Sequence, residues 1–310
     1  MWYLYGQSTA EQGATMASGT LRAVLAYTSW PGVMLGSLAL TGALLAAGVS
    51  APTTIAALTI GNFLLLAVLE QAMPRLPGSS LLRDRQSARD AAHGALFTFV
   101  GRPLASGLAL LLVALAGVTW RGAHTANLWP VAAPLLAQVG LALAIWSLGN
   151  YALHRAMHSF DFLWWFHSIH HDTPQMHVLK SGRIHVIDEM LQFLLLPLPL
   201  FALGAPTEVL VWLGLWTVFE GNLAHSNLDQ RFPYFAHYLV QTPQVHAVHH
   251  AQDRRLQDSN YSGPCALWDL LFGTFRHPDL HPVVSLGIAD SPVPPGFVAQ
   301  LAFPFRRSAR

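Results

Sequence analysis

The sequence predicts an all-α fold, a multi-pass membrane helical bundle with about four transmembrane helices, a short re-entrant hairpin and a cytoplasmic histidine-rich helical cap. Composition is the first reason, because 53% of the 310 residues are hydrophobic and only 11% are charged. A soluble domain carries about 25% charged residues. Second, uncharged apolar runs close to the ~20 residues that cross a bilayer recur along the chain. Third, 14 of the 16 histidines follow residue 150, so potential metal ligands are concentrated in one half of the chain.

Two simple counts exclude other classes of protein. The formal net charge is +1, which gives no electrostatic basis for binding nucleic acid. The chain has one cysteine, Cys265, and therefore has neither an intrachain disulfide framework nor a zinc or iron–sulfur site built from cysteines.

The first two transmembrane helices are predicted at residues 31–50 and 52–69, with the break between them at Ala51 and Pro52. Both runs are uncharged. The alternative is a pair of helices buried in a soluble bundle, but neither run shows a polar face at helical spacing. We therefore predict a helical hairpin in the membrane.

A basic loop at residues 70–95 sets the predicted orientation. It contains Arg75, Arg83, Arg85 and Arg89, and the positive-inside rule assigns such a loop to the cytoplasm. A third span at 104–118 and a fourth at 131–149 then return the chain to the same side. The histidine-rich stretch 151–171 is therefore predicted to emerge in the cytoplasm.

Two shorter apolar segments follow, at residues 190–203 and 209–219. Apolar segments of about 10–14 residues are more often interfacial or re-entrant than spanning, so we predict a hairpin that enters the membrane and returns. Only an even number of crossings here brings the histidines before and after it to one face. Three regions result: a membrane region at 1–130 with three spans and the basic loop, a histidine-containing domain at 131–277, and a proline-rich tail at 278–310.

The spacing of the histidines indicates metal binding. A lone histidine is usually a packing or surface residue, but here one HxxxH pair and two HxxHH clusters occur together. Residues three and four apart share one face of a helix, so each cluster can turn its rings into a common space. Imidazole suits iron, zinc, copper and nickel. Eight ligands exceed the need of one ion, so the spacing implies two: His154, His158, His167, His170, His171, His246, His249 and His250.

The order of these motifs resembles the fatty acid hydroxylase/sterol desaturase superfamily of membrane di-iron enzymes. The resemblance rests on HRAMH at 154–158, WWFHSIHH at 164–171 and TPQVHAVHH at 242–250. It extends to SGRIHVIDEM at 181–190, LAHSN at 223–227 and DSNYSGPCALWDLLFGTF at 258–275. Val186 stands where the family has proline, which is a departure. The match covers about residues 135–277, so the 131–277 region resembles a fatty acid hydroxylase catalytic domain.

The resemblance implies further site residues. His185 and His225 would complete the ligand set with the eight histidines above, whereas His177 matches no motif position. Metal-bound imidazoles usually donate their second N–H to a carboxylate or carbonyl. Asp188, Asn227, Asp258 and Asn260 are the preferred partners, ahead of Asp161, Asp172 and Asp269.

The remaining histidines and the aromatic residues beside the boxes receive other roles. His237, His277 and His281 are expected at the surface or in packing, His93 precedes the motif region, and His124 is expected on the opposite side of the membrane. Trp164, Trp165 and Phe166 are expected to anchor the site at the membrane interface, and Trp268 and Phe272 to pack.

The implied activity is a di-iron oxygenase that uses O2 to hydroxylate an unactivated C–H bond of a lipid drawn from the membrane. The resemblance implies two iron ions, which zinc can replace in a purified sample. It also implies a separate electron donor of the ferredoxin or cytochrome b5 type with a reductase, because the chain has no haem or nucleotide motif. Arg155, Arg254 and Arg255 could receive that donor or could equally meet lipid phosphate.

Three alternatives remain. The same site could act as a lipid or sterol desaturase or cleave C–C bonds, and hydroxylation is favoured because it places fewer constraints on a second hydrogen. A membrane metal-binding or transport protein is the alternative from another class. Transporters bind their cargo near the midplane of the bilayer, whereas every histidine motif here lies outside the apolar runs.

The arginine-rich, lysine-poor composition favours a bacterial inner membrane over the endoplasmic reticulum.

Overall fold

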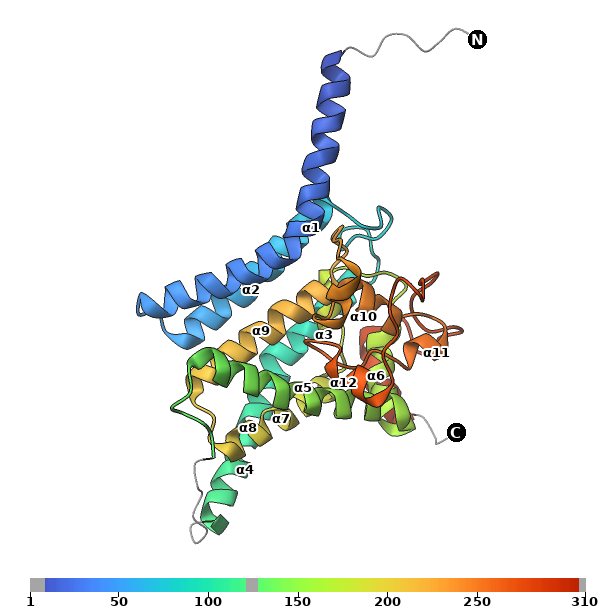
Figure 1. Cartoon of the computed structure of the whole chain (residues 1–310). Coiled ribbons are helices and arrows are strands. Elements are labelled where there is room, and N and C mark those ends of the chain that lie inside the picture. The colour runs from blue at the N-terminus through green and yellow to red at the C-terminus, as the bar shows by residue number, and fades with distance from the viewer. Residues whose placement is uncertain (1–8, 121–127, 307–310) are drawn as a thin grey trace.

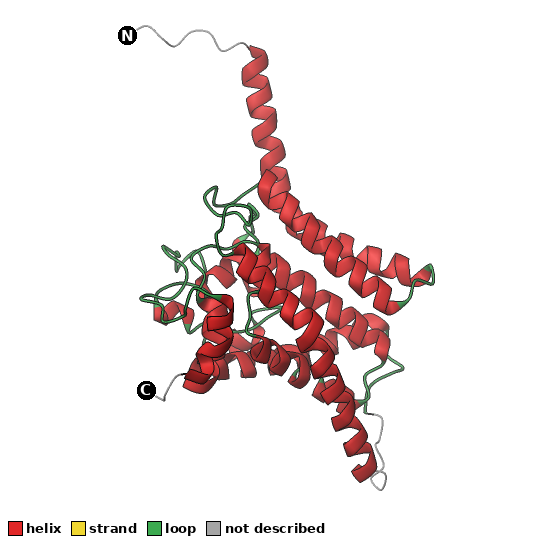
Figure 2. Ribbon diagram, turned by 180° about the vertical axis from the view of Figure 1, so that it is seen from behind, coloured by secondary structure: helices red, strands yellow, loops and turns green. Residues whose placement is uncertain are grey.

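The computed structural model describes residues 9–120 and 128–306, without the side chains of 9–19, 110 and 113–120. His124 lies outside these residues. Within the described ranges the regular elements are helices (Figure 1, Figure 2), and the sheet-like pairing is limited to two isolated bridges, Pro74 with Leu228 and Ala251 with Leu286. The predicted all-α class is confirmed. By length and composition four segments could cross a membrane: Thr20–Ala46, Ala51–Ala72, Leu135–Ser159 and Val186–Leu203.

The predicted hairpin is formed by α1 (Thr9–Ala46) and α2 (Ala51–Ala72), which lie side by side (Figure 1). Ser50 caps α2, because its hydroxyl accepts a hydrogen bond from the backbone N–H of Thr53. Pro52 falls in the first turn of α2, where a missing N–H costs nothing. The first helix begins earlier than predicted, because α1 starts at Thr9 and the predicted span starts at residue 31.

The predicted basic loop is partly helical, which corrects the expectation for residues 87–95. The helix α3 (Ser87–Leu96) continues through a π-helical turn at Phe97–Gly101 into α4 (Arg102–Trp120), which contains the predicted third span. Asp90 is fully buried and contacts Lys180 and Arg183. The sequence suggests a solvated polar stretch, but part of it packs inward because the Asp90 carboxylate pairs with cations from a distant segment.

The first histidine motifs lie on two consecutive helices, α5 (Leu135–Ser159) and α6 (Asp161–His171). Phe160 separates them with an extended backbone, so the chain turns between His158 and His167. The fourth span was predicted from residue 131, but Pro134 precedes the helix and α5 begins after it. As predicted, α5 continues without a break through His154 and His158.

The predicted re-entrant segments are longer than the sequence suggested. The first consists of α7 (Val186–Leu195) and α8 (Leu198–Leu203), which together are long and apolar enough to span. Gly204 has a positive φ of 81° and ends α8, as glycine commonly does. The second segment is α9 (Thr207–His225), a 19-residue helix that extends beyond 209–219 at both ends.

Helix α9 is the centre of the fold. It packs against α1, α2 and α5 and lies between them in Figure 1. Leu215, Phe219 and Leu223 are completely buried. Its last residue is His225, so the packing of one apolar helix carries a histidine from the membrane region to the other motifs.

The chain after α6 also forms short helices, of which α10, α11 and α12 lie near α6 in Figure 1: η2 (Val178–Gly182), η3 (Tyr234–Tyr238), α10 (Pro243–His249), α11 (Arg254–Gln257), α12 (Leu267–Phe272), α13 (Phe297–Ala302) and η4 (Phe303–Arg306). The proline-rich segment packs back onto the protein, with Phe303 against Trp165 and Gln300 bonded to His93.

The expected aromatic anchor is not at the surface. Trp164, Trp165 and Phe166 are 7%, 4% and 3% exposed. They face inward because α6 is covered by α7 and the C-terminal helix. Phe160 and Phe162, at the start of α6, are exposed instead.

Candidate metal centre

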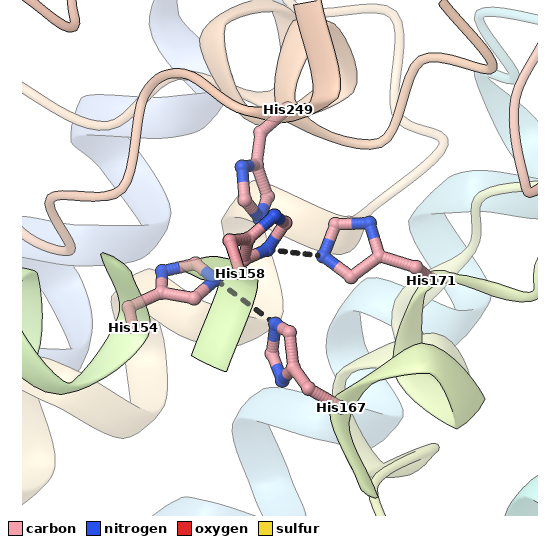
Figure 3. A group of neighbouring side chains, drawn as sticks. All are labelled: His154, His158, His167, His171 and His249. Carbon is pink, nitrogen blue, oxygen red and sulfur yellow. Dashed lines mark hydrogen bonds between the residues drawn. The ribbon is translucent and has the colours of Figure 1, made fainter. Parts of the chain in front are cut away.

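Nine histidines from four helices, α5, α6, α9 and α10, form two adjacent groups. Within each group one ring nitrogen of every member lies within 4.8 Å of the others. Figure 3 shows the first group, with rings from α5, α6 and α10 turned toward one centre. His171 of the first group stacks on His250 of the second, with ring centres 4.5 Å apart. The first group is His154, His158, His167, His171 and His249, and the second is His170, His225, His246 and His250.

The outward nitrogens of the first group are held by oxygen atoms. His154 donates its Nδ1–H to the carbonyl oxygen of Tyr261 at 2.8 Å, and His249 donates to that of Ser259 at 2.7 Å. The Nδ1 atom of His167 lies 2.8 Å from an Asp188 oxygen, and that of His158 lies 3.0 Å from an Asp258 oxygen. Such partners fix the tautomer of an imidazole and its orientation.

The second group is oriented mainly by the backbone. His225 donates its Nδ1–H to the carbonyl oxygen of Gly221, one turn earlier in α9, at 2.8 Å. His170 donates to the carbonyl oxygen of Arg183 at 3.3 Å. The sequence motifs could not reveal these partners, because any residue supplies a carbonyl oxygen.

The inward nitrogens come close without a proton between them. A neutral imidazole has one N–H, and His154 and His167 both use theirs on Nδ1. Their Nε2 atoms therefore both carry lone pairs, yet they lie 3.0 Å apart (dashed in Figure 3). The Nε2 atoms of His170 and His225 lie 3.2 Å apart in the same situation. Two lone pairs at this distance repel, so the arrangement favours a cation between them.

A transition-metal ion fits these distances. Two nitrogens about 2.1 Å from one ion, at a right angle to each other, are about 3 Å apart. The Nε2 atom of His249 is buried without any hydrogen-bond partner, which leaves its lone pair free for the same ion. Both groups consist only of imidazoles, a donor set that suits iron, zinc and copper.

Burial keeps the rings neutral. It is the largest cause that holds the pKa of His170, His171, His246, His249 and His250 well below the ordinary value, and neighbouring imidazoles lower it further. Only a neutral ring can bind a metal, so the environment prepares these side chains for an ion.

Three residues of the predicted set do not join the groups. The Nδ1 atom of His185 accepts a hydrogen bond from the backbone N–H of Ile187, and its Nε2 atom lies 3.2 Å from the Leu301 carbonyl oxygen. His185 caps α7 and packs against Phe166. The structure therefore gives this histidine a role in helix capping and packing.

Asn227 and Asn260 connect loops and touch no histidine ring of either group. Asn227 binds the carbonyl oxygens of Leu76 and Ser79. Asn260 has a positive φ of 53° and joins Val245, beside His246, to Arg276. Both side chains bond to backbone groups and not to an imidazole. The spacing of residues in the sequence does not reveal which of these partners an asparagine has.

A buried ion network supports the second histidine box. Arg183 is completely buried, donates to the carbonyl oxygen of Ile169, and contacts Asp90 at 2.6 Å and Asp172 at 3.1 Å. Lys180 contacts Asp90 at 2.6 Å and also pairs with Asp84. Because Arg183 binds the end of α6 and its own carbonyl receives His170, the network links α3 to the metal groups.

The other histidines of the described chain lie outside the two metal groups. His177 is buried and lies 3.0 Å from Asp84 beside Lys180. His237 and His277 are each 3% exposed and pack as expected, whereas the partly exposed His281 belongs to neither metal group. Asp269 binds the N–H groups of Tyr261 and Ser262, and so holds the loop whose carbonyl receives His154.

Comparison with known proteins identifies the family. The model of the fatty acid hydroxylase family matches residues 139–274. Ornithine lipid hydroxylase OlsE of Rhizobium tropici is 35% identical over 248 residues, which cover 79% of this chain and 74% of that protein. Human alkylglycerol monooxygenase is 27% identical over 135 residues, covering 41% of this chain but only 28% of the relative.

More distant matches include the very-long-chain aldehyde decarbonylase GL1-6 of Oryza sativa, 30% identical over 135 residues, or 20% of its length. No solved structure matches the chain. The histidine groups, the family model and the long match to a hydroxylase agree: the chain belongs to the fatty acid hydroxylase superfamily.

Proposed function

We propose that this protein is a membrane di-iron oxygenase that hydroxylates an unactivated C–H bond of an amine-bearing lipid. The observation that carries the proposal is the approach of two unprotonated nitrogens, Nε2 of His154 and Nε2 of His167, to 3.0 Å. Such a pair supports a bound cation. The names of the related proteins, a lipid hydroxylase and a monooxygenase, support hydroxylation over desaturation.

The nine histidines of the two groups would hold two iron ions, one in each group. Bound iron would supply the activation of O2 by which one oxygen atom enters a C–H bond. The protein's own residues hold the ligands in place. Asp188 and Asp258 receive the outward protons of His167 and His158, while backbone carbonyls receive those of His154 and His249.

The substrate class is inferred from the membrane helices and from a relative that is matched over most of its length. A site at the end of apolar helices can receive a lipid from the bilayer without exposing the metal groups to water, because eight of the nine histidines are at most 7% exposed and His154 is half-buried. The related OlsE is named for ornithine lipid. We infer an acyl lipid whose headgroup carries a free amine.

Electrons must come from a donor outside this chain, and one surface leads directly to the metal groups. The exposed Arg254 lies with its guanidinium 4.6 Å from the ring centre of Trp164. The Trp164 ring lies 5.1 Å from that of His158 and 5.4 Å from that of His171. We propose that a one-electron donor protein of the ferredoxin or cytochrome b5 type docks around Arg254, and that Trp164 shortens the path to the metal.

The orientation also belongs to the proposal. The arginines near residues 75–89 favour a cytoplasmic position for the face that carries the histidines. The bacterial OlsE relative supports a bacterial inner membrane. Fusion of a reporter to the C-terminus tests this, since a periplasmic reporter signal contradicts it.

Lipid analysis tests the activity. Expression of the protein in a bacterium that contains ornithine lipid should produce a lipid heavier by one oxygen atom, and growth under 18O2 should place the heavy isotope in it. The His249→Ala variant should produce none. Loss of two hydrogens instead would indicate desaturation. Tight metal binding without O2 consumption under any reductant would favour the transport or metal-storage alternative.

A further inference from the structure

We propose that Glu220 is the binding site for the ammonium group of the lipid substrate. This inference rests on the proposed function and assigns the amine of that substrate to one carboxylate. Glu220 lies in α9, five residues before His225. At 1.5 Å per residue this is about 7.5 Å along the helix axis, so the carboxylate lies on the membrane side of the second metal group.

The Glu220 carboxylate is buried, and one of its two oxygens has no partner. The residue is 5% exposed, its Oε1 atom has no hydrogen-bond donor, and no salt bridge reaches it in the part of the chain that the structure describes. Three other buried acids are paired: Asp90 has two cations, Asp188 has His167 and Gln192, and Asp269 has backbone N–H groups. One oxygen of Glu70 and one of Glu189 lack a partner in the same way as Oε1 of Glu220. An unpaired carboxylate is costly to bury, and within a membrane protein it points to function.

The surroundings of Glu220 belong to the metal centre. Burial raises the pKa of the Cys265 thiol, and the charge of the Glu220 carboxylate raises it by a smaller amount, so the two side chains belong to the same region. Cys265 follows Tyr261, whose carbonyl oxygen receives His154, by four residues. The carbonyl of the neighbouring Pro264 accepts from Gln241, whose side chain lies 3.4 Å from Nδ1 of His246.

A second polar residue, Asn150, lies one turn before His154 on α5. Gly263 approaches Asn150 so closely that a Cβ on it would lie 3.1 Å from the Asn150 Oδ1 atom. Asn150 precedes His154 by four residues and therefore lies on the same face of the helix. Asn150 thus lies beside the 261–265 loop, and Glu220 acts electrostatically on Cys265 of the same loop.

This arrangement matches a cationic headgroup that arrives from the bilayer. A carboxylate with no partner accepts a charge-assisted hydrogen bond from a primary ammonium group. The bond would hold the headgroup next to the metal groups and would distinguish an amine lipid from a neutral one. A charge-assisted bond in a buried site corresponds to an affinity difference of about 10- to 100-fold.

Binding measurements test the assignment directly. The protein in lipid nanodiscs is incubated with ornithine lipid or with the same lipid N-acetylated on its side-chain amine, and retained lipid is measured by native mass spectrometry. The unchanged protein should retain the free amine at least 10-fold better. Glu220→Gln should remove that preference while leaving the acetylated lipid unaffected, and Glu220→Asp should keep part of it. Glu208→Gln, the same change at the exposed start of α9, is the matched control.

The outcomes separate this inference from the proposed function. Equal retention of both lipids by the unchanged protein overturns the inference even if no variant folds. Preserved amine preference in Glu220→Gln, with normal metal content, also overturns it and leaves the hydroxylase proposal intact. Competition by free ornithine as strong as by the lipid would show that the site takes a soluble amine and would contradict a lipid headgroup. Failure of the unchanged protein to oxidise any lipid would instead contradict the proposed function.

Discussion

The Nε2 atoms of His154 and His167 lie 3.0 Å apart although each ring already uses its single proton elsewhere, on Tyr261 and Asp188. The same pattern recurs between His170 and His225. Closely spaced lone pairs are unfavourable unless an ion lies between them. These pairs are therefore stronger evidence for a bound metal than the number of histidines.

Removal of one ligand should remove one ion. We expect His249→Ala and His167→Ala to lower metal content by about one ion per chain and to abolish lipid hydroxylation, because both belong to the five-histidine group. Elemental analysis of the purified protein measures the metal. His281→Ala, which belongs to neither group, should retain both metal and activity. Equal loss in all three variants would mean that the groups are not the metal site.

The carboxylate behind His167 should control metal affinity. Asp188→Asn exchanges an acceptor for an amide that can donate, so His167 loses its fixed tautomer. Loss of such a partner typically weakens metal binding about 10- to 100-fold. Titration with a competing chelator measures the change. Asp161→Asn, at the exposed first turn of the same helix, should leave the titration unchanged.

The buried ion network should be essential for folding. Asp90 contacts Lys180 and Arg183, each at 2.6 Å, and all three side chains are buried. Asp90→Asn would leave two buried cations short of one counter-charge, and breaking a buried pair costs about 3–5 kcal/mol. Thermal unfolding in detergent should show a clear loss of stability. Asp253→Asn, which breaks the exposed pair with Arg255, should have no measurable effect; a comparable loss there would contradict the argument.

Acid should destabilise the protein and release its metal. The buried rings of His170, His171, His246, His249 and His250 have pKa values well below the ordinary 6.5. The unfolded chain therefore takes up protons first as the pH falls below about 6.5, while the folded rings stay neutral. Stability is fully present above that pH and is lost below it, by up to about 1.4 kcal/mol per ring for each pH unit.

Unfolding temperatures and metal content measured between pH 8 and pH 5, in roughly half-unit steps, test this direction. Both should fall together on the acid side. Stability that rises as the pH falls would show that the rings are not buried in the neutral form.

The surface at Arg254 should matter for electron delivery alone. Arg254→Glu reverses a charge that is half exposed and stacks on Trp164. We expect several-fold slower turnover with a protein donor, caused by weaker docking, and unchanged turnover with a small chemical reductant. Arg85→Glu, an exposed arginine elsewhere, should behave like the unchanged protein with both reductants. Equal slowing of Arg254→Glu with both reductants would place its effect in the site itself, through Asp258 and His158.

The sequence alone determined the class of the protein and the core of the site. Low charge and long apolar runs are properties of local composition, so they predicted a helical membrane protein without any knowledge of packing. The spacing of His167, His170 and His171, and of His246 to His250, places rings on one helical face by geometry alone. The order of the motifs carried the family.

The tertiary structure decided which distant residues meet. His185 and His225 looked alike in sequence, but α9 carries His225 into the second group whereas His185 caps α7. Asp90 looked like a loop residue until Lys180 and Arg183 approached it across about ninety residues. Trp164 looked like an interfacial anchor until the C-terminal helices and Arg254 covered α6. Local spacing sets which face of a helix a side chain occupies, but what that face contacts depends on the packing of segments far apart in the chain.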